Sequence, residues 1–78
     1  MQFTSAQCRA ARALLKWSQD DLAEASKVGK RTIADFERDL REPYERTLRD
    51  LMVALEEAGI EFIPENGGGA GVRFRKRI

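Results

Sequence analysis

The 78 residues suffice for one small domain, and a chain that is 42% hydrophobic and 35% charged is globular. It has no apolar run near the roughly 18 residues that a membrane span requires, and its opening residues lack the apolar centre of a signal peptide, so we expect a cytoplasmic protein. The single cysteine excludes an internal disulfide, and without histidine we expect no metal site and no cofactor. We also expect no enzymatic activity, since no pairing of a nucleophile with a base is evident.

The formal net charge is only +1, which is low for a nucleic-acid-binding protein. The charge is nevertheless polarised along the chain. Residues 1–42 carry 8 Lys or Arg against 7 Asp or Glu, residues 43–66 carry 2 against 6, and residues 67–78 carry 4 against none. A local basic surface is therefore compatible with the low total.

The first predicted helix covers residues 5–16. Thr4 is followed three residues later by Gln7, which is the spacing of a capping box. The apolar face of this helix consists of Cys8, Ala11, Leu14 and Leu15. We expect Cys8 to be a small core residue, because no cationic or helix-start environment lowers its pKa. Trp17 is expected to anchor the following helix rather than to stack on bases.

Two short helices joined by a tight turn are predicted over residues 18–38. Ser18 can cap the first helix, and the acidic residues that follow it favour the positive end of the helix dipole. The second helix begins near Gly29 or Lys30. The apolar positions of the pair are Leu22, Ala23, Val28, Ile33 and Phe36. This spacing fits two amphipathic helices that meet at an angle.

The second helix of this pair also has a polar stripe opposite its apolar one. The stripe consists of Lys30, Arg31, Ala34, Asp35 and Arg38. A polar stripe of this kind, beside a buried one, is what a helix needs in order to read a DNA groove.

The residues KWSQDDLAEASKVGKRTIADFERDLREP resemble the helix-turn-helix of the phage-repressor and Cro (Xre-like) family, and the resemblance covers roughly residues 8–58. Members pair a "WSQ" opening with "LA", a turn, an "RTI" recognition helix and a following "E". The chain departs from the family at Lys27, where members commonly have Gly in the turn, and at Gly29, where they have a Ser or Thr cap. A non-Gly residue in a left-handed turn costs about 1 kcal/mol. The resemblance also implies an ion pair between Arg12 and Glu37.

A fourth helix is predicted from Tyr44 or Glu45 to Ala58. Pro43 blocks continuation of the preceding helix, and Gly59 provides a C-terminal stop. The apolar face consists of Leu48, Leu51, Met52, Leu55 and Ala58. The predicted fold class is therefore mainly α. Residues 1–59 are expected to form a small four-helix domain that resembles the repressor-type helix-turn-helix domain.

Residues 60–78 change to a period of two and predict a C-terminal β-hairpin with a Gly-rich turn at residues 66–71. In its second strand, Val72 and Phe74 form an apolar face that we expect to pack on the helices; Arg73, Arg75 and Arg77 form the opposite face. We expect the hairpin to mediate dimerisation, because its edge otherwise needs a cover. The alternatives are that its basic residues contact DNA or that the tail is simply solvated. A phosphate-binding glycine loop is disfavoured because no helix follows it.

Two functions compete. The first is a sequence-specific DNA-binding transcriptional regulator, a dimeric repressor that reads the major groove of double-stranded DNA with helix 30–38. Base edges would be read by Lys30, Arg31, Ala34 and Asp35. The phosphate backbone would be contacted by Gln19, Lys27, Arg38 and Arg41, while Thr32, between the two stripes, either reaches a phosphate or faces inward. The second function is that of a module that binds another protein, as an antitoxin or antiactivator, which the acidic middle and Asp35 favour.

Overall fold

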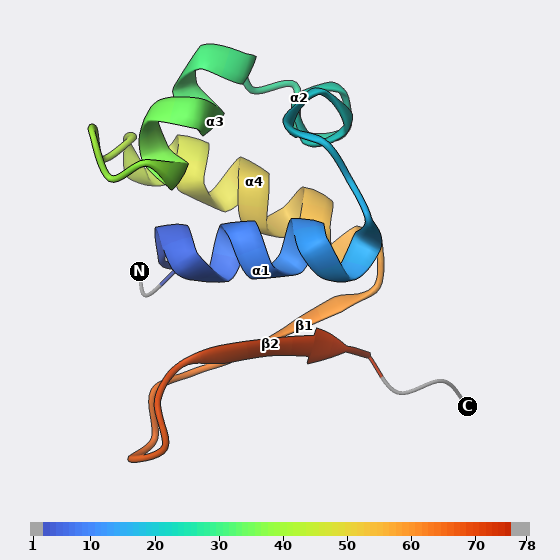
Figure 1. The fold of residues 1–78 in the computed structure, drawn as a ribbon, viewed down its shortest axis with the longest axis vertical. Coiled ribbons are helices and arrows are strands. Elements are labelled where there is room, and N and C mark those ends of the chain that lie inside the picture. The colour runs from blue at the N-terminus through green and yellow to red at the C-terminus, as the bar shows by residue number, and fades with distance from the viewer. Residues whose placement is uncertain (1–2, 76–78) are drawn as a thin grey trace.

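The computed structural model describes residues 3–75. Within them the elements are α1 (Ser5–Leu15), α2 (Gln19–Ser26), α3 (Lys30–Glu37), α4 (Glu45–Glu57), β1 (Ile60–Ile63) and β2 (Gly71–Phe74). Figure 1 shows α2 and α3 at one end of the molecule, α1 and α4 in the middle, and the hairpin at the other end. The predicted four helices and C-terminal hairpin are confirmed.

Local sequence determines where α1 begins and ends. Thr4 accepts a hydrogen bond from the Gln7 backbone N–H at 3.1 Å, and the Gln7 side chain accepts from the Thr4 N–H at 3.0 Å, so the predicted capping box is present. Lys16 adopts a left-handed conformation with φ 59°, which ends α1 one residue earlier than predicted. The sequence also placed Leu14 on the buried face, and this was wrong: Leu14 is 37% exposed, because it borders a hollow where α1 and α4 end.

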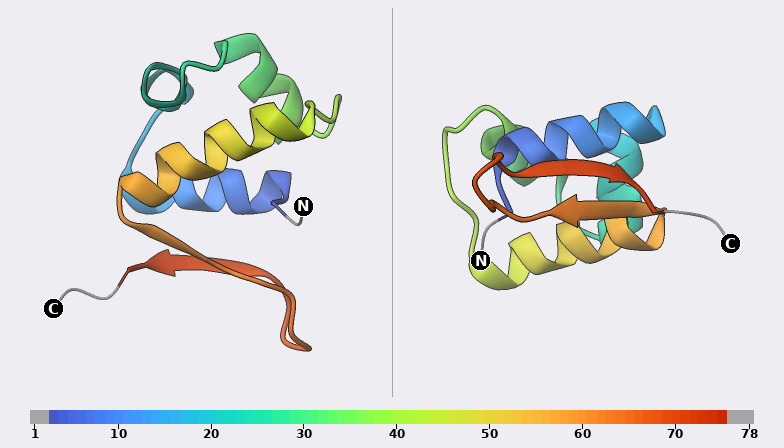
Figure 2. Two further views of the ribbon diagram at one scale, coloured as in Figure 1. Left: turned by 180° about the vertical axis from the view of Figure 1, so that it is seen from behind. Right: turned by 90° about the horizontal axis from the view of Figure 1, so that it is seen from below.

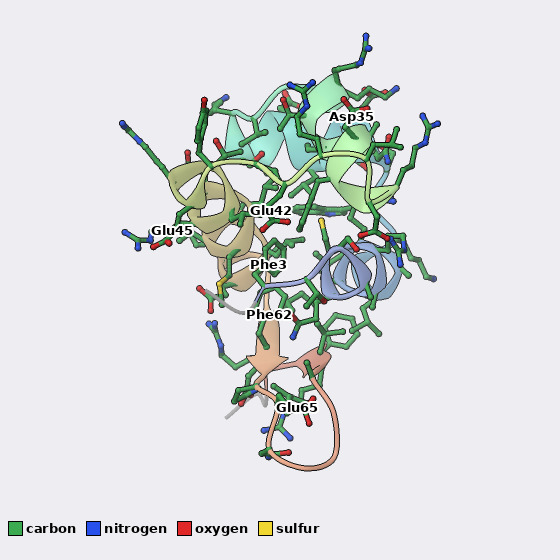
Figure 3. The ribbon with its side chains drawn as sticks, turned by 90° about the vertical axis from the view of Figure 1, so that its left-hand side faces the viewer. Phe3, Asp35, Glu42, Glu45, Phe62 and Glu65 are labelled. Carbon is green, nitrogen blue, oxygen red and sulfur yellow. The ribbon has the colours of Figure 1, made fainter. Side chains whose placement is uncertain are left out.

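The core joins all four helices to the hairpin. Its fully buried large side chains are Leu22, Ile33, Leu51, Leu55, Ile60 and Cys8. Phe3 lies between the helices and the hairpin (Figure 3), with its ring centroid 5.7 Å from that of Phe36 and 5.1 Å from that of Phe62, the second contact being edge to face. Cys8 and Phe36 therefore have the core positions predicted for them, and Trp17 packs against the core as expected.

The hairpin lies across one side of α1 and α4. Ile60 pairs with Phe74 and Ile63 with Gly71 in antiparallel register, and Figure 2 shows β2 beside α1 and β1 beside α4. Val72 packs on the core as expected, but the expectation that Phe74 is covered was wrong, since Phe74 is 54% exposed. The reason is that α1 and α4 both end at this level and leave a hollow beside it. Arg77 lies outside the described residues.

Candidate nucleic-acid interface

The turn between α2 and α3 is held by short-range hydrogen bonds. The Ser26 hydroxyl donates to the Leu22 carbonyl at 2.7 Å and accepts from the Val28 N–H at 3.2 Å. Lys27 has φ 64°, so a lysine occupies the left-handed turn position where the family resemblance leads us to expect glycine. At the other end of α2, Ser18 and Asp21 form a second reciprocal capping box. Both ends of α2 are thus determined locally.

Helix α3 is oriented by two fully or nearly fully buried side chains. Ile33 is 0% and Phe36 is 3% exposed. Because these residues point into the core, the opposite side of α3 faces solvent, where Arg31 has a side chain that is 92% exposed. Lys30 and Arg38 are also exposed. The structure thus brings the predicted basic residues of α3 together on one outer surface.

Three predicted residues of α3 are only half exposed. They are Thr32, Ala34 and Asp35. Asp35, labelled in Figure 3, lies 3.7 Å from Arg31 across one helical turn, and Lys30 lies 3.2 Å from Asp20 at the start of α2. Exposed pairs of this kind contribute about 0.2–1 kcal/mol each, so these cations can release their partners at small cost.

The buried carboxylate of Glu37, in the last turn of α3, forms hydrogen bonds with side chains of α1 and α2. Glu37 accepts from Arg12 Nε at 2.8 Å and Nη2 at 2.6 Å, from Gln19 Nε2 at 3.1 Å and from Cys8 Sγ at 3.1 Å. The ion pair that the family resemblance implied between Arg12 and Glu37 is therefore present. Gln19, predicted to contact phosphate, is half-buried and uses one amide N–H in this cluster.

The same cluster extends to the backbone and alters the ionisation of its members. Arg12 Nη1 donates to the Trp17 carbonyl at 2.9 Å, and Arg9 donates to the Glu37 carbonyl. Burial alone would raise the pKa of Glu37, but hydrogen bonds from Arg12, Gln19 and Cys8 lower it below its ordinary value. Burial and the neighbouring Glu37 strongly raise the pKa of the Cys8 thiol, so this thiol is not a reactive group.

The remaining predicted contacts lie on either side of α3. Lys27 is exposed in the turn before it, and Arg41 is exposed in the loop after it. Arg41 and Thr32 border a surface hollow of about 320 Å³ that continues to the start of α4.

Two residues on this hollow were missed by sequence reasoning. Tyr44, the N-cap of α4, is 87% exposed and makes no capping hydrogen bond through its side chain, and Thr47 lies in the first turn of the helix. The available signal was an aromatic residue at a helix start where a capping residue is usual. No side chain caps the backbone N–H groups of that first turn.

In residues 3–75 no group of three His, Cys, Asp or Glu side chains is arranged to hold a metal ion, and no helix has the length and hydropathy of a membrane span. A protein-family model described as "Helix-turn-helix" matches residues 9–61, which is more than half of the chain. No curated protein matches the sequence.

Proposed function

Since this chain belongs to the helix-turn-helix family of Xre-type DNA-binding transcription regulators, we propose that it binds a specific duplex sequence as a homodimer and acts as a repressor. One observation carries the proposal. Helix α3 is held down by Ile33 and Phe36 while its basic residues Lys30 and Arg31 remain exposed on the opposite side. This is the arrangement that a helix needs in order to enter a major groove.

The base-reading roles follow from the side chains of α3. Arg31 and Lys30 can each donate to guanine O6 and N7, and Asp35 can accept from cytosine N4 once Arg31 has exchanged it for a base. Ala34 lies between them and offers a methyl group to thymine. The ion pairs Arg31–Asp35 and Lys30–Asp20 orient these side chains before DNA binds.

The phosphate contacts surround this reading surface. Lys27, Arg38 and Arg41 supply charge, and Gln19 has one amide N–H left beyond its bond to Glu37. Thr32, Arg41 and Tyr44 border one hollow, where hydroxyl and guanidinium groups suit a phosphate oxygen and the Glu42 carboxylate does not. These contacts fix the register of α3 on the duplex and carry little sequence information themselves.

Dimerisation is proposed because one short α3 contacts few base pairs. Two copies related by a two-fold axis would read two half-sites about 34–36 Å apart, which matches successive major grooves. The protein would act in the compartment that holds the DNA, and repression needs only that the bound dimer exclude other proteins from the site.

Selection of bound duplexes from a random pool tests this function directly. We expect a motif with two-fold symmetry and an affinity that falls steeply with salt, because each phosphate contact releases counterions. The second candidate is protein binding, favoured by the acidic residues Asp20 and Asp35, which already pair with the α3 cations Lys30 and Arg31. No enriched motif, together with salt-insensitive binding, would reject the first function and support the second.

Replacing Arg31 with alanine is expected to remove specific binding and leave the fold intact. The side chain is 92% exposed, so unfolding free energy should change by no more than about 0.5 kcal/mol, whereas a lost bidentate base contact costs roughly 1–3 kcal/mol in discrimination. Titration of the selected duplex and of a scrambled one measures the difference. Arg49→Ala is the matched control, because Arg49 is also exposed and pairs with Glu45 four residues away at 3.6 Å. Equal losses in both variants would refute the proposed reading surface.

A further inference from the structure

The loop that follows α3 is hydrogen-bonded to the start of α1, and we propose that this contact positions the arginines of the loop for the phosphate backbone. The loop spans residues 38–43 and carries Arg38 and Arg41, to which the proposed function assigns phosphate contacts. The positioning residues are Ser5, at the start of α1, and Asp39, which lies between the two arginines. The inference rests on the proposed function and deepens it, because neither positioning residue needs to touch DNA.

The end of α3 adopts a Schellman motif with an aspartate in place of the usual glycine. The Leu40 N–H donates to the Asp35 carbonyl at 2.8 Å, and the Asp39 N–H donates to the Phe36 carbonyl at 3.0 Å. Asp39 has φ 60°, a left-handed conformation that favours glycine. Its carboxylate also lies at the negative end of the helix dipole. Both features disfavour aspartate, so a contact outside α3 accounts for it better than the helix itself.

That contact is made by α1. The Ser5 hydroxyl donates to Asp39 Oδ1 at 2.6 Å, a length typical of a hydrogen bond to a charged oxygen. Arg9, one turn further along α1, donates to the Glu37 carbonyl in the last turn of α3. Figure 1 shows the start of α1 beneath the loop that follows α3. Two contacts from neighbouring turns of one helix therefore hold the end of α3 and the beginning of the loop.

The remainder of the loop has few other restraints. Within residues 3–75, Ser5–Asp39 is the side-chain hydrogen bond that reaches residues 39–43, and no ion pair involves Arg38 or Arg41. Both arginines are exposed. Ordering a free loop and its long side chains on binding lowers affinity. The bond from Ser5 fixes in advance the backbone from which both arginines extend.

The direction of the Asp39 carboxylate matters as well as the loop backbone. Arg41 lines the same hollow as Thr32, so the loop continues the side of α3 that the proposed function places against DNA. A carboxylate turned toward that side would repel the bound phosphates. Its hydrogen bond to Ser5 instead directs the carboxylate toward α1. Ser5 thus acts on DNA affinity through Asp39.

A double-mutant cycle measured on DNA affinity tests the positioning role. Asp39→Asn and Asp39→Gly both remove the charge and both suit the left-handed conformation, but only asparagine retains an oxygen that accepts from Ser5. We expect Asp39→Gly to bind a short duplex of random sequence about two- to fivefold more weakly than Asp39→Asn. Ser5→Ala should cause a similar loss in the Asp39→Asn background and none in the Asp39→Gly background. Ser5→Thr, which retains the hydroxyl, should restore the affinity.

Thermal unfolding of the same variants separates positioning from a loss of folded protein. Both residues lie at the surface, so each variant should be fully folded at the temperature of the binding measurement. Equal affinities of Asp39→Asn and Asp39→Gly, or a Ser5→Ala loss of equal size in both backgrounds, would overturn the inference. A parent that binds no duplex at low salt would reject the proposed function and this inference together. A parent that binds, with no coupling in the cycle, would reject the inference alone.

Discussion

Phe36→Ala is expected to unfold the domain at ordinary temperature, so that no cooperative unfolding transition is observed. Phe36 is 3% exposed, contacts Phe3 and holds α3 on the core, so its truncation should cost on the order of 3–5 kcal/mol. Domains in general have about 5–15 kcal/mol of stability, and one of this size lies toward the lower end. Thermal and urea unfolding followed by circular dichroism would measure the loss.

The matched control for this change is Leu40→Ala. Leu40 is 62% exposed, so the same kind of truncation there should change stability by no more than about 0.5 kcal/mol. A cooperative transition of Phe36→Ala close to that of the parent would show that α3 is not held by this side chain. The assignment of the opposite side of α3 to DNA would then lose its basis.

The second large effect is expected at the Arg12–Glu37 pair. The Glu37 side chain is 2% exposed and the Arg12 side chain 19%, with 2.6 Å between their charged atoms. Removing either residue leaves the other with no charge partner, so Arg12→Ala and Glu37→Ala should each cost on the order of 3 kcal/mol. The double variant should lose less than the sum, with a coupling free energy of about 1–3 kcal/mol.

The exposed pair Arg49–Glu45 provides the control cycle. Its charged atoms lie 3.6 Å apart on the surface of α4, and its coupling should be about 0.3–0.5 kcal/mol. Unfolding free energies of the two cycles, measured in urea, give the comparison. Additive losses at Arg12 and Glu37 would contradict a direct energetic link between α1 and α3.

The same cluster predicts a pH dependence. The pKa of Glu37 is lower in the folded chain than its ordinary value, so the unfolded chain binds its proton more tightly. The stabilisation is therefore complete above the unfolded pKa, about 4.3, and is lost as pH falls through the folded pKa. Glu37→Gln should show a correspondingly shallower loss of stability in acid.

The elements of this fold were predictable because their signals are local. The pairs Thr4–Gln7 and Ser18–Asp21 lie three residues apart, and each begins a helix through bonds within its own first turn. The spacing of Ile33 and Phe36 was sufficient to identify the buried side of α3 and, by exclusion, its exposed basic side.

The errors came from residues whose environment depends on distant segments. Leu14 and Phe74 lie on faces that periodicity marks as apolar, yet both are exposed, because α1 and α4 end beside them. Gln19 likewise gives an amide N–H to Glu37, 18 residues away. Periodicity assigns a residue to a face, but it contains no information about how far along that face the packing extends.

The sequence by itself therefore determined the starts of α1 and α2, the turn, the hairpin and the side of α3 that faces outward, since hydrogen bonds or periodicity within a few residues set each of them. Only the tertiary structure decided how Glu37 joins α1, α2 and α3, and which apolar side chains of α1 and β2 remain uncovered. The reason is physical. Burial depends on the summed contacts of segments far apart in the chain, and those contacts exist only after the helices and the hairpin have packed.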